Sequence, residues 1–262
     1  MDFNEQDLRS LLSGKYIGDP LHFFRDATST NAIAMKLAEA GAPEGAVVIA
    51  DSQTKGRGRL RDREWLSPPG LNLYTSVLLR PEIDAVLTSP LALVAGVAVA
   101  ELLSRYCPGR IAVKWPNDVL INGKKVCGIL AEIKATGKKT QFIILGIGLN
   151  INMKKEDLTP DIRDSATSIR EETGAEMSRF KTTVELYEQI GKFYMIFLRD
   201  GFGRIRDLWH DYSGISGQYV EATFGEETFR GKAAGIDETG ALIVTDETGK
   251  TRRIIAGDVH QA

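Results

Sequence analysis

A succession of short apolar runs joined by tight-turn signals, between residues 111 and 151, most constrains the fold of this chain. Asn122-Gly123 separates two such runs, the second over residues 126–133, and Thr136-Gly137 separates that run from a third over residues 142–151. Asn-Gly between apolar runs is the strongest short-range signal for a two-residue β-hairpin. Because consecutive hairpins join antiparallel neighbours, we predict a largely antiparallel sheet rather than a doubly wound parallel one.

Strands and helices are predicted on both sides of these hairpins. Further strands are expected over residues 22–26, 46–50, 73–79 and 111–115. Ser29-Thr30-Asn31 offers N-cap oxygens before a helix that ends at Gly41, and Thr88-Ser89-Pro90 precedes a nearly all-apolar helix running to about Tyr106. Residues 167–212 have helical periodicity. The fold class that these elements predict is α+β, with a mixed, largely antiparallel sheet flanked by helices.

The pattern changes at Gly214. Short strands over residues 219–224, 229–236, 241–244 and 252–255 alternate with turns, as in a small β-barrel. A unit this short buries too little apolar surface to fold alone, so we expect it to pack on the main domain. The predicted domains are residues 1–213 and 214–262.

Composition narrows the function classes. The formal net charge of −2 gives the whole chain no attraction to DNA or to an anionic membrane. We find no uninterrupted apolar run of about 18 residues and no signal-like N-terminus. Cys107 and Cys127 lack metal-ligand spacing and are expected to be reduced, packed thiols. We therefore expect a cytoplasmic protein that neither spans a membrane nor binds DNA.

A basic, glycine-containing segment lies in the long loop predicted over residues 52–70. It reads Gly56-Arg57-Gly58-Arg59 and is extended by Arg61 and Arg63. Glycines let backbone N–H groups approach an anion, and guanidinium groups bind phosphate bidentately. The spacing is neither that of a P-loop nor that of a dinucleotide fingerprint. A phosphate-binding loop and a solvated or RNA-contacting loop both fit, although only Trp65 is near for base stacking.

Two strand ends and one strand flank carry further candidate residues. The segment 114–118, KWPND, ends a strand with an amide and a carboxylate, which fits either a ligand site or an Asx-type turn. Lys125 flanks the next strand, where a charged residue is common without any catalytic role. The segment 146–150, GIGLN, places two glycines on one strand face, which indicates close approach of a ligand or tight helix–sheet packing.

Taken together, these segments occur in the order found in biotin protein ligases, a family that this chain resembles from about residue 22 to residue 259. The resemblance implies a class II synthetase-like catalytic domain followed by a small SH3-like barrel, to which the segment 235–242, GIDETGAL, is similar. It also implies that ATP, with Mg²⁺, activates biotin to biotinyl-5′-AMP, releasing pyrophosphate. Biotin would then pass to a lysine of a biotin carboxyl carrier protein, of acetyl-CoA carboxylase or a related carboxylase. A homodimer is a further expectation.

The resemblance assigns a role to individual residues. The biotin-binding residues would be Ser29, Thr30, Asn31, Gln53, Gly56, Arg57, Gly58, Arg59, Lys125 and Gly128. The nucleotide-binding residues would be Arg59, Arg63, Trp65, Lys114, Trp115, Asn117, Asp118 and Asn150. The catalytic residues would be Lys125, Arg57, Arg59 and Asp118, of which Asp118 is a candidate base by placement alone. No cluster of direct metal ligands is predicted, and Mg²⁺ would sit on the ATP phosphates near Asp118.

The chain departs from the family pattern in two places. The family commonly has GRGR-x-G-R-x-W, whereas this chain has GRGRLRDREW, one residue longer and without the third glycine, so the alignment of residues 61–64 is open. Many relatives carry an N-terminal DNA-binding domain, for which the residues ahead of the first strand are too few. We therefore expect a monofunctional ligase. The alternatives are a lipoate–protein ligase and a non-catalytic ligand- or RNA-binding module.

Overall fold

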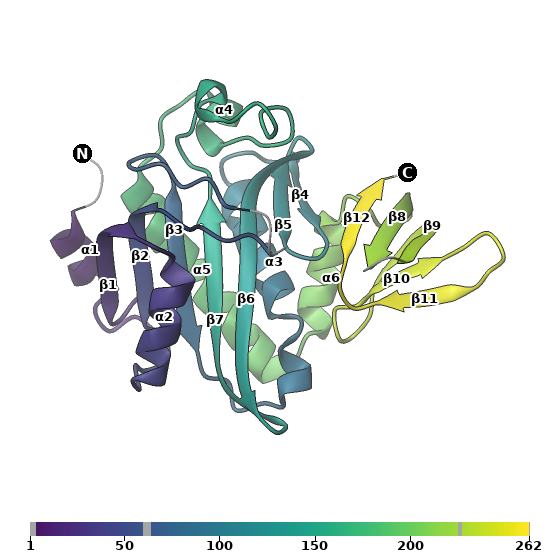
Figure 1. Ribbon diagram of the computed structural model, residues 1–262, viewed down its shortest axis with the longest axis horizontal. Helices are drawn as coiled ribbons and strands as arrows, with labels where there is room; N and C mark the ends of the chain where they lie inside the picture. Colours follow the sequence, from purple (N-terminus) through teal and green to yellow (C-terminus); the bar gives the residue numbers. More distant parts are fainter. Residues whose placement is uncertain (1–3, 60–63, 225–226, 262) are drawn as a thin grey trace.

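A seven-stranded sheet forms the centre of the molecule in the computed structural model, which describes residues 4–59, 64–224 and 227–261 (Figure 1). Its strand order is β1-β2-β3-β7-β6-β5-β4. The strands are β1 (Leu21–Ala27), β2 (Val47–Gln53), β3 (Leu73–Leu79), β4 (Ile111–Lys114), β5 (Asp118–Ile121), β6 (Lys124–Thr136) and β7 (Lys139–Leu149). Strands β1 and β2 are parallel and the other neighbours antiparallel, so the predicted mixed, largely antiparallel sheet is confirmed.

The hairpins form where the turn signals predict them. Asn122 and Gly123 have φ values of 50° and 77°, the positive pair that a type I′ turn requires. Strand β6 begins at Lys124 and continues to Thr136, beyond both ends of the predicted strand. Lys125 is therefore a residue of the strand and not only its flank.

One face of the sheet is closed by α1 (Glu5–Leu12), α3 (Leu91–Ser104), α5 (Arg179–Asp200) and α6 (Gly203–Tyr212). Every second residue of β7 from Ile143 to Leu149 packs in this layer. Residues 85–104 include the 3₁₀ turn η1 (Ala85–Thr88) and α3, and an 18-residue window within them has a mean hydropathy of 2.0 and is 72 % buried. By length and composition this stretch could cross a membrane, which corrects the expectation that no segment could. Ser89 and Glu101 interrupt the apolar run, but the mean hydropathy remains high enough for a membrane-spanning helix. Its burial against α5 and the sheet is that of a core helix.

The other face is covered only in part. Helix α2 (Thr30–Glu39), with Ser29 at its N-cap as predicted, packs through Ala34 and Ala38 against Leu78 and Ile144. Beyond the N-terminus of α2, the same face of β3, β6 and β7 carries small residues: Ser76, Gly128, Gly146 and Gly148. Small residues leave room above the strands, and this uncovered half of the sheet holds the candidate site.

The predicted helical region over residues 167–212 is divided into three helices. Helix α4 (Ile169–Thr173) ends at Gly174, and α5 ends at Gly201, both with φ near 73–74°. Only glycine adopts such positive φ values at little cost, so the two glycines end the helices. The loop before α4 contains the 3₁₀ turn η2 (Lys155–Asp157).

A second sheet packs beside α6 (Figure 1). It contains β8 (Tyr219–Phe224), β9 (Glu227–Ile236), β10 (Leu242–Thr245), β11 (Thr251–Ile254) and β12 (Asp258–Gln261), in the order β11-β10-β9-β8-β12. The first four strands were predicted, but β12, which pairs with β8, was not. The Trp115 indole N–H donates to the Gly240 carbonyl oxygen at 2.9 Å, so the second sheet is fastened to the first, as expected.

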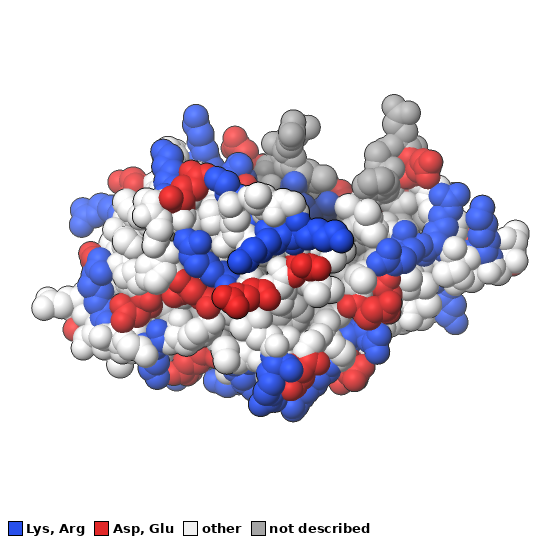
Figure 2. Space-filling model, turned by 90° about the horizontal axis from the view of Figure 1, so that it is seen from below, with Lys and Arg blue, Asp and Glu red and all other residues white. Residues whose placement is uncertain are grey.

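Charged side chains are mixed on the face shown in Figure 2, where lysines and arginines lie among aspartates and glutamates. This agrees with the formal net charge of −2. Small groups of lysines and arginines in the centre and at the right of this view lie next to acidic side chains, so neither sign dominates the face as a whole.

Candidate functional site

The uncovered half of the sheet forms a cavity of about 50 Å³. Clefts that enclose drug-sized ligands have volumes of roughly 300 Å³ or more, so a part of the wall must shift to admit such a ligand. The wall is made by segments far apart in the sequence, which bring together most of the predicted biotin-binding residues. The lining residues are Ser29, Thr30, Asn31, Gln53, Arg57, Gly58, Arg59, Trp65, Asn117, Lys125, Gly128, Ile129, Leu130, Gly146, Ile147 and Gly148.

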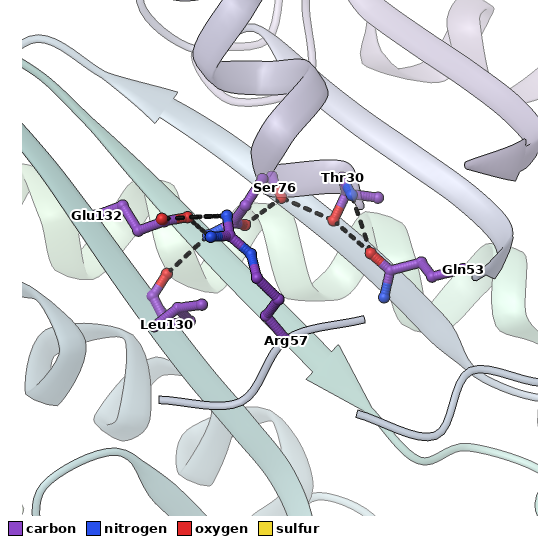
Figure 3. Close-up of polar contacts among 7 residues, drawn as sticks. Thr30, Gln53, Arg57, Ser76, Leu130 and Glu132 are labelled. Carbon is purple, nitrogen blue, oxygen red and sulfur yellow. Dashed lines mark hydrogen bonds and ion pairs between the residues drawn. The ribbon is translucent and has the colours of Figure 1, made fainter. Parts of the chain in front are cut away.

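Hydrogen bonds fix the side chains at the N-terminus of α2 (Figure 3). The Gln53 side-chain oxygen accepts from the Thr30 backbone N–H at 2.9 Å and from the Thr30 hydroxyl at 3.2 Å. The Ser76 hydroxyl lies 2.8 Å from the Thr30 Oγ1 and 2.6 Å from the Asn31 Oδ1. Thr30, Asn31 and Ser76 are all buried, so this side of the cavity has a fixed set of polar groups, as a preorganised binding site requires.

The strand glycines are explained by close contact with other side chains of the protein. A Cβ added at Gly146 would lie 2.1 Å from the Asn31 Oδ1, so this glycine allows α2 to pack on the sheet. Gly128 and Gly148 face each other across β6 and β7, and added Cβ atoms would lie 2.7 and 2.4 Å from atoms of the Trp65 indole. The indole therefore lies directly over the glycine pair and fills space that a ligand could use.

The basic loop folds back on itself before it reaches the sheet. Arg57 and Glu64 form an isolated antiparallel bridge, and the Trp65 N–H donates to the Gly56 carbonyl oxygen at 2.9 Å. A Cβ at Gly56 would lie 2.5 Å from the Trp65 carbonyl oxygen, so Gly56 serves the loop's own closure and does not line the cavity. Arg63, the predicted nucleotide contact, lies outside the described residues, as does Arg61.

Two basic side chains of the cavity wall contact carboxylates. The Arg57 Nη2 lies 3.1 Å from each carboxylate oxygen of Glu132. The Lys125 Nζ lies 2.7 Å from the Asp118 Oδ1 and 5.3 Å from the centroid of the Trp65 ring, within cation–π range. Both cations are therefore balanced locally by an acid of the same chain.

Arg59 is held by the second sheet. Its guanidinium donates to the Gly257 carbonyl oxygen at 2.9 Å, to the Asp258 carboxylate, and to the Asn117 Oδ1 at 3.2 Å. The Arg59 side chain is 25 % exposed, against 52 % for Arg57, so it is the more firmly enclosed of the two. The start of β12 thus contributes to the cavity through an arginine that it binds.

Several predicted nucleotide contacts lie outside the cavity wall. Trp115 is buried and hydrogen-bonded to Gly240, and it lines a second, largely apolar cavity of about 520 Å³. The Asn150 side chain donates to the Thr167 carbonyl oxygen at 3.0 Å and is buried, so it holds the chain that follows β7. Lys114 and Asp118 pair across β4 and β5 and do not line the first cavity either.

The described residues provide no cluster of protein ligands for a metal ion, and Cys127 is a packed thiol. In residues 4–59, 64–224 and 227–261, no three His, Cys, Asp or Glu side chains lie close enough together to hold a metal ion. Cys127 neighbours Gly128, but its side chain is buried on the helix-covered side of the sheet. Burial raises the pKa of the Cys127 thiol well above its usual range, so the thiol is protonated and unreactive, as its packed position predicts.

Several residues that contribute to the site escaped the sequence analysis, among them Ser76, Ile129, Leu130, Glu132 and Asp258. The two-residue period of a strand places Leu130 and Glu132 on the same face as Gly128, so this signal could have found them. The alternation of β3 could likewise have found Ser76. Asp258 had no such signal, because its strand was not predicted.

Comparison with known proteins agrees with this geometry. Residues 23–150 match the model of the biotin/lipoate A/B protein ligase family, and residues 215–260 match the biotin protein ligase C-terminal domain. The chain is 36 % identical over 257 residues to the bifunctional ligase/repressor BirA of Bacillus subtilis, covering 98 % of this chain and 78 % of that protein. It belongs to the biotin protein ligases. The resemblance expected from the sequence motifs is thereby confirmed.

Further relatives support the assignment to the biotin protein ligases. A biotin–acetyl-CoA-carboxylase ligase of Paracoccus denitrificans is 35 % identical, covering 85 % of this chain and 92 % of that one. The biotin protein ligase from Aquifex aeolicus, solved in complex with biotin and ATP, superposes with a TM-score of 0.80 at 31 % identity. That match covers 93 % of this chain and 100 % of the other.

The contact between Trp65 and Gly148 can be tested by Gly148→Ala. The added methyl would overlap the indole, so Trp65 must move outward, at a cost of about 1–3 kcal/mol for overpacking. Trp115 and Trp209 are buried, so a rise in acrylamide quenching of tryptophan fluorescence would report on Trp65. Gly203→Ala, where an added Cβ meets nothing within 4 Å, is the matched control. Unchanged quenching in a folded Gly148→Ala protein would contradict the contact.

Proposed function

We propose that this protein is an ATP-dependent biotin protein ligase. It activates biotin to biotinyl-5′-AMP with release of pyrophosphate and transfers biotin to a lysine of the carrier protein of acetyl-CoA carboxylase or a related carboxylase. The observation that carries the proposal is the cavity, where fixed polar groups of α2 and β2 face Arg57, Arg59 and Lys125. The superposition on a ligase solved with biotin and ATP supports the choice of ligands.

The basic residues reduce the repulsion between the biotin carboxylate and the ATP phosphates in the first step, the formation of the adenylate. Joining a carboxylate to the α-phosphate of ATP brings two anions together, and two unit charges about 4 Å apart repel by roughly 4 kcal/mol at an effective dielectric of 20. Arg57, Arg59 and Lys125 line the cavity and offset this repulsion by holding the developing negative charge. Mg²⁺ usually binds through phosphates and one or two carboxylates, and Asp118 beside Lys125 is a carboxylate of that kind. When bound, Mg²⁺ supplies further neutralisation of the phosphates.

The remaining wall residues bind the two substrates. Ser29, Thr30, Asn31 and Gln53 present the fixed donors and acceptors that suit the polar ring of biotin. Trp65 and Asn117 line the same cavity, and we assign them to the nucleotide. The loop that carries Trp65 would move outward to admit the ligands and then cover the mixed anhydride, which keeps water away from it.

The second step needs a neutral amine. A free lysine has a pKa of about 10.4, so at pH 7 less than about 0.1 % of it is unprotonated. Asp118 is our candidate for assisting proton removal, since it lies beside Lys125 and its side chain is 20 % exposed. A carboxylate at this place also stabilises the ammonium group of the approaching lysine before the proton leaves.

The wider organisation follows the same proposal. Residues 1–213 would form the catalytic domain and residues 214–262 an SH3-like domain, a division supported by the two separate sheets and the family match over residues 215–260. Free, buried cysteines suit a reducing, cytoplasmic setting. The formal net charge of −2 supports a role without DNA or membrane binding. A homodimer is our proposal for the oligomeric state.

The proposed function is tested by incubating the purified protein with biotin, ATP and Mg²⁺ and detecting biotinyl-5′-AMP by mass spectrometry. We expect the adenylate and an equal amount of pyrophosphate, and biotin on a carrier fragment when one is added. A parallel reaction contains lipoic acid in place of biotin. A lipoyl adenylate as the main product, or no adenylate from a folded sample, would overturn the assignment.

Lys125→Ala should reduce biotin-dependent pyrophosphate release by at least about 100-fold, as expected when one preorganised charge at a developing anion is lost. The rate is measured with saturating ATP and biotin. Lys124→Ala, which removes the neighbouring positive charge from the other face of β6, is the control and should retain most of the activity. Comparable rates in the two variants would remove Lys125 from the catalytic group.

Asp258→Asn should let biotinyl-5′-AMP escape faster, because Arg59 loses its carboxylate on β12. We expect a several-fold increase in escape rate, measured by trapping released adenylate, and an increase at least as large for Arg59→Gly, which also removes the bonds to Gly257 and Asn117. Both changes break the same contact between Arg59 and Asp258. The double variant should therefore release adenylate no faster than Arg59→Gly alone. Glu247→Gln removes an acid elsewhere on the second sheet and should leave the rate unchanged. Additive effects would show that Asp258 acts independently of Arg59.

A further inference from the structure

Glu132 contacts both the fixed side of the cavity and the basic loop (Figure 3). The Asn31 Nδ2 donates to the Glu132 Oε2 at 2.7 Å, and the Arg57 Nη2 lies 3.1 Å from both carboxylate oxygens. Glu132 is not among the residues that line the cavity. It therefore contacts two lining residues without facing a ligand itself.

The two contacts differ in mobility. Asn31 is 4 % exposed, and its amide also accepts from Ser76 and donates to the Leu130 carbonyl oxygen at 3.3 Å. The Asn31 contact therefore holds one oxygen of Glu132 in place. Arg57, by contrast, is 52 % exposed and is held by Glu132 at the solvent side. Its guanidinium can leave Glu132 by rotation of its own side chain, without a shift of the sheet or of α2.

The energies allow such an exchange. The Arg57 side chain is 52 % exposed and the Glu132 side chain 26 %, so water reaches the pair, and ion pairs open to water contribute about 0–1 kcal/mol because water screens the charges. A substrate carboxylate inside the cavity is less screened, so it can compete with Glu132 for Arg57. The competition requires no rearrangement of the fixed wall, since Arg57 already lines the cavity.

We propose that Glu132 is a positioning residue that holds Arg57 until the carboxylate of biotin takes its place. The inference rests on the proposed function. Glu132 then lowers the affinity for biotin by the free energy of its own pair with Arg57. A neutral biotin derivative does not recruit Arg57 and escapes this competition. Glu132 thereby links release of the loop arginine to the charge of the ligand.

Glu132→Gln separates the two contacts. The amide oxygen of glutamine can still accept from the Asn31 Nδ2, so the fixed wall is retained. The charge that holds Arg57 is lost, and the amide N–H₂ group offers no acceptor in its place. Glu39→Gln is the matched control, because it breaks the exposed pair of Glu39 with Lys134, two residues further along β6.

The experiment measures binding of biotin and of biotin methyl ester by calorimetry, at low and high salt. In Glu132→Gln we expect the Kd for biotin to fall about two- to fivefold, the range set by an exposed ion pair. The Kd for the uncharged ester should not change. The salt dependence of biotin binding should become steeper. In the parent protein, binding gains the Arg57–biotin attraction but loses the Arg57–Glu132 pair, and salt weakens both; in Glu132→Gln only the attraction remains. Glu39→Gln should match the parent protein throughout.

Other outcomes would contradict the inference. An equal change for biotin and its ester, or weaker binding of both, would show that Glu132 acts only by orienting Asn31. In an Arg57→Gln background, Glu132→Gln should give no gain in biotin affinity, and a gain there would also overturn the proposal. Failure of the parent protein to bind biotin at all would instead contradict the proposed function.

Discussion

The site depends on how closely other groups can approach the backbone of β6 and β7. One face of these strands carries apolar side chains that are closed off by helices, and the other carries glycines at positions 128, 146 and 148. Without Cβ atoms, this second face accepts the Asn31 amide and the Trp65 indole in direct contact. A side chain at any of the three positions would displace one of these groups. The arrangement of the cavity wall therefore depends on glycines on one face of the sheet and apolar side chains on the other.

Each basic side chain of the wall has an acid as its partner: Glu132 for Arg57, Asp258 for Arg59 and Asp118 for Lys125. Three unpaired cations so close together would repel one another and would need strong solvation. With an acid beside each cation, bringing the three cations together costs little free energy. The cations are then already oriented when a substrate anion competes with the acids for them. Such preorganisation avoids reorganisation of the site during the reaction. The acids thus belong to the site although none of them lines it.

The central sheet could be predicted well from the sequence, because the residues that specify its hairpins lie close to one another in the chain. Asn122-Gly123 and the alternating runs specify hairpins within a few residues of themselves, and the structure follows them. The partners of the loop arginines are different, because Arg57 and Glu132 are 75 residues apart and Arg59 and Asp258 are 199 apart. No local pattern encodes such contacts. For the same reason, Trp115 and Asn150 could be identified in motifs while their buried, structural bonds could not.

The two arginines of the loop differ in a way that sets the order of loop movement. Arg59 is enclosed by Asn117, a backbone carbonyl and a carboxylate, so releasing it breaks several bonds between the two sheets. The Arg57 side chain is itself more exposed than that of Arg59, 52 % against 25 %, and among the described residues its carboxylate partner is Glu132. Screening makes the exposed pair the weaker of the two. Arg57 therefore yields first, to a substrate charge, while Arg59 keeps the loop attached to β12. The C-terminal sheet thus contributes to the active site by holding one end of the loop.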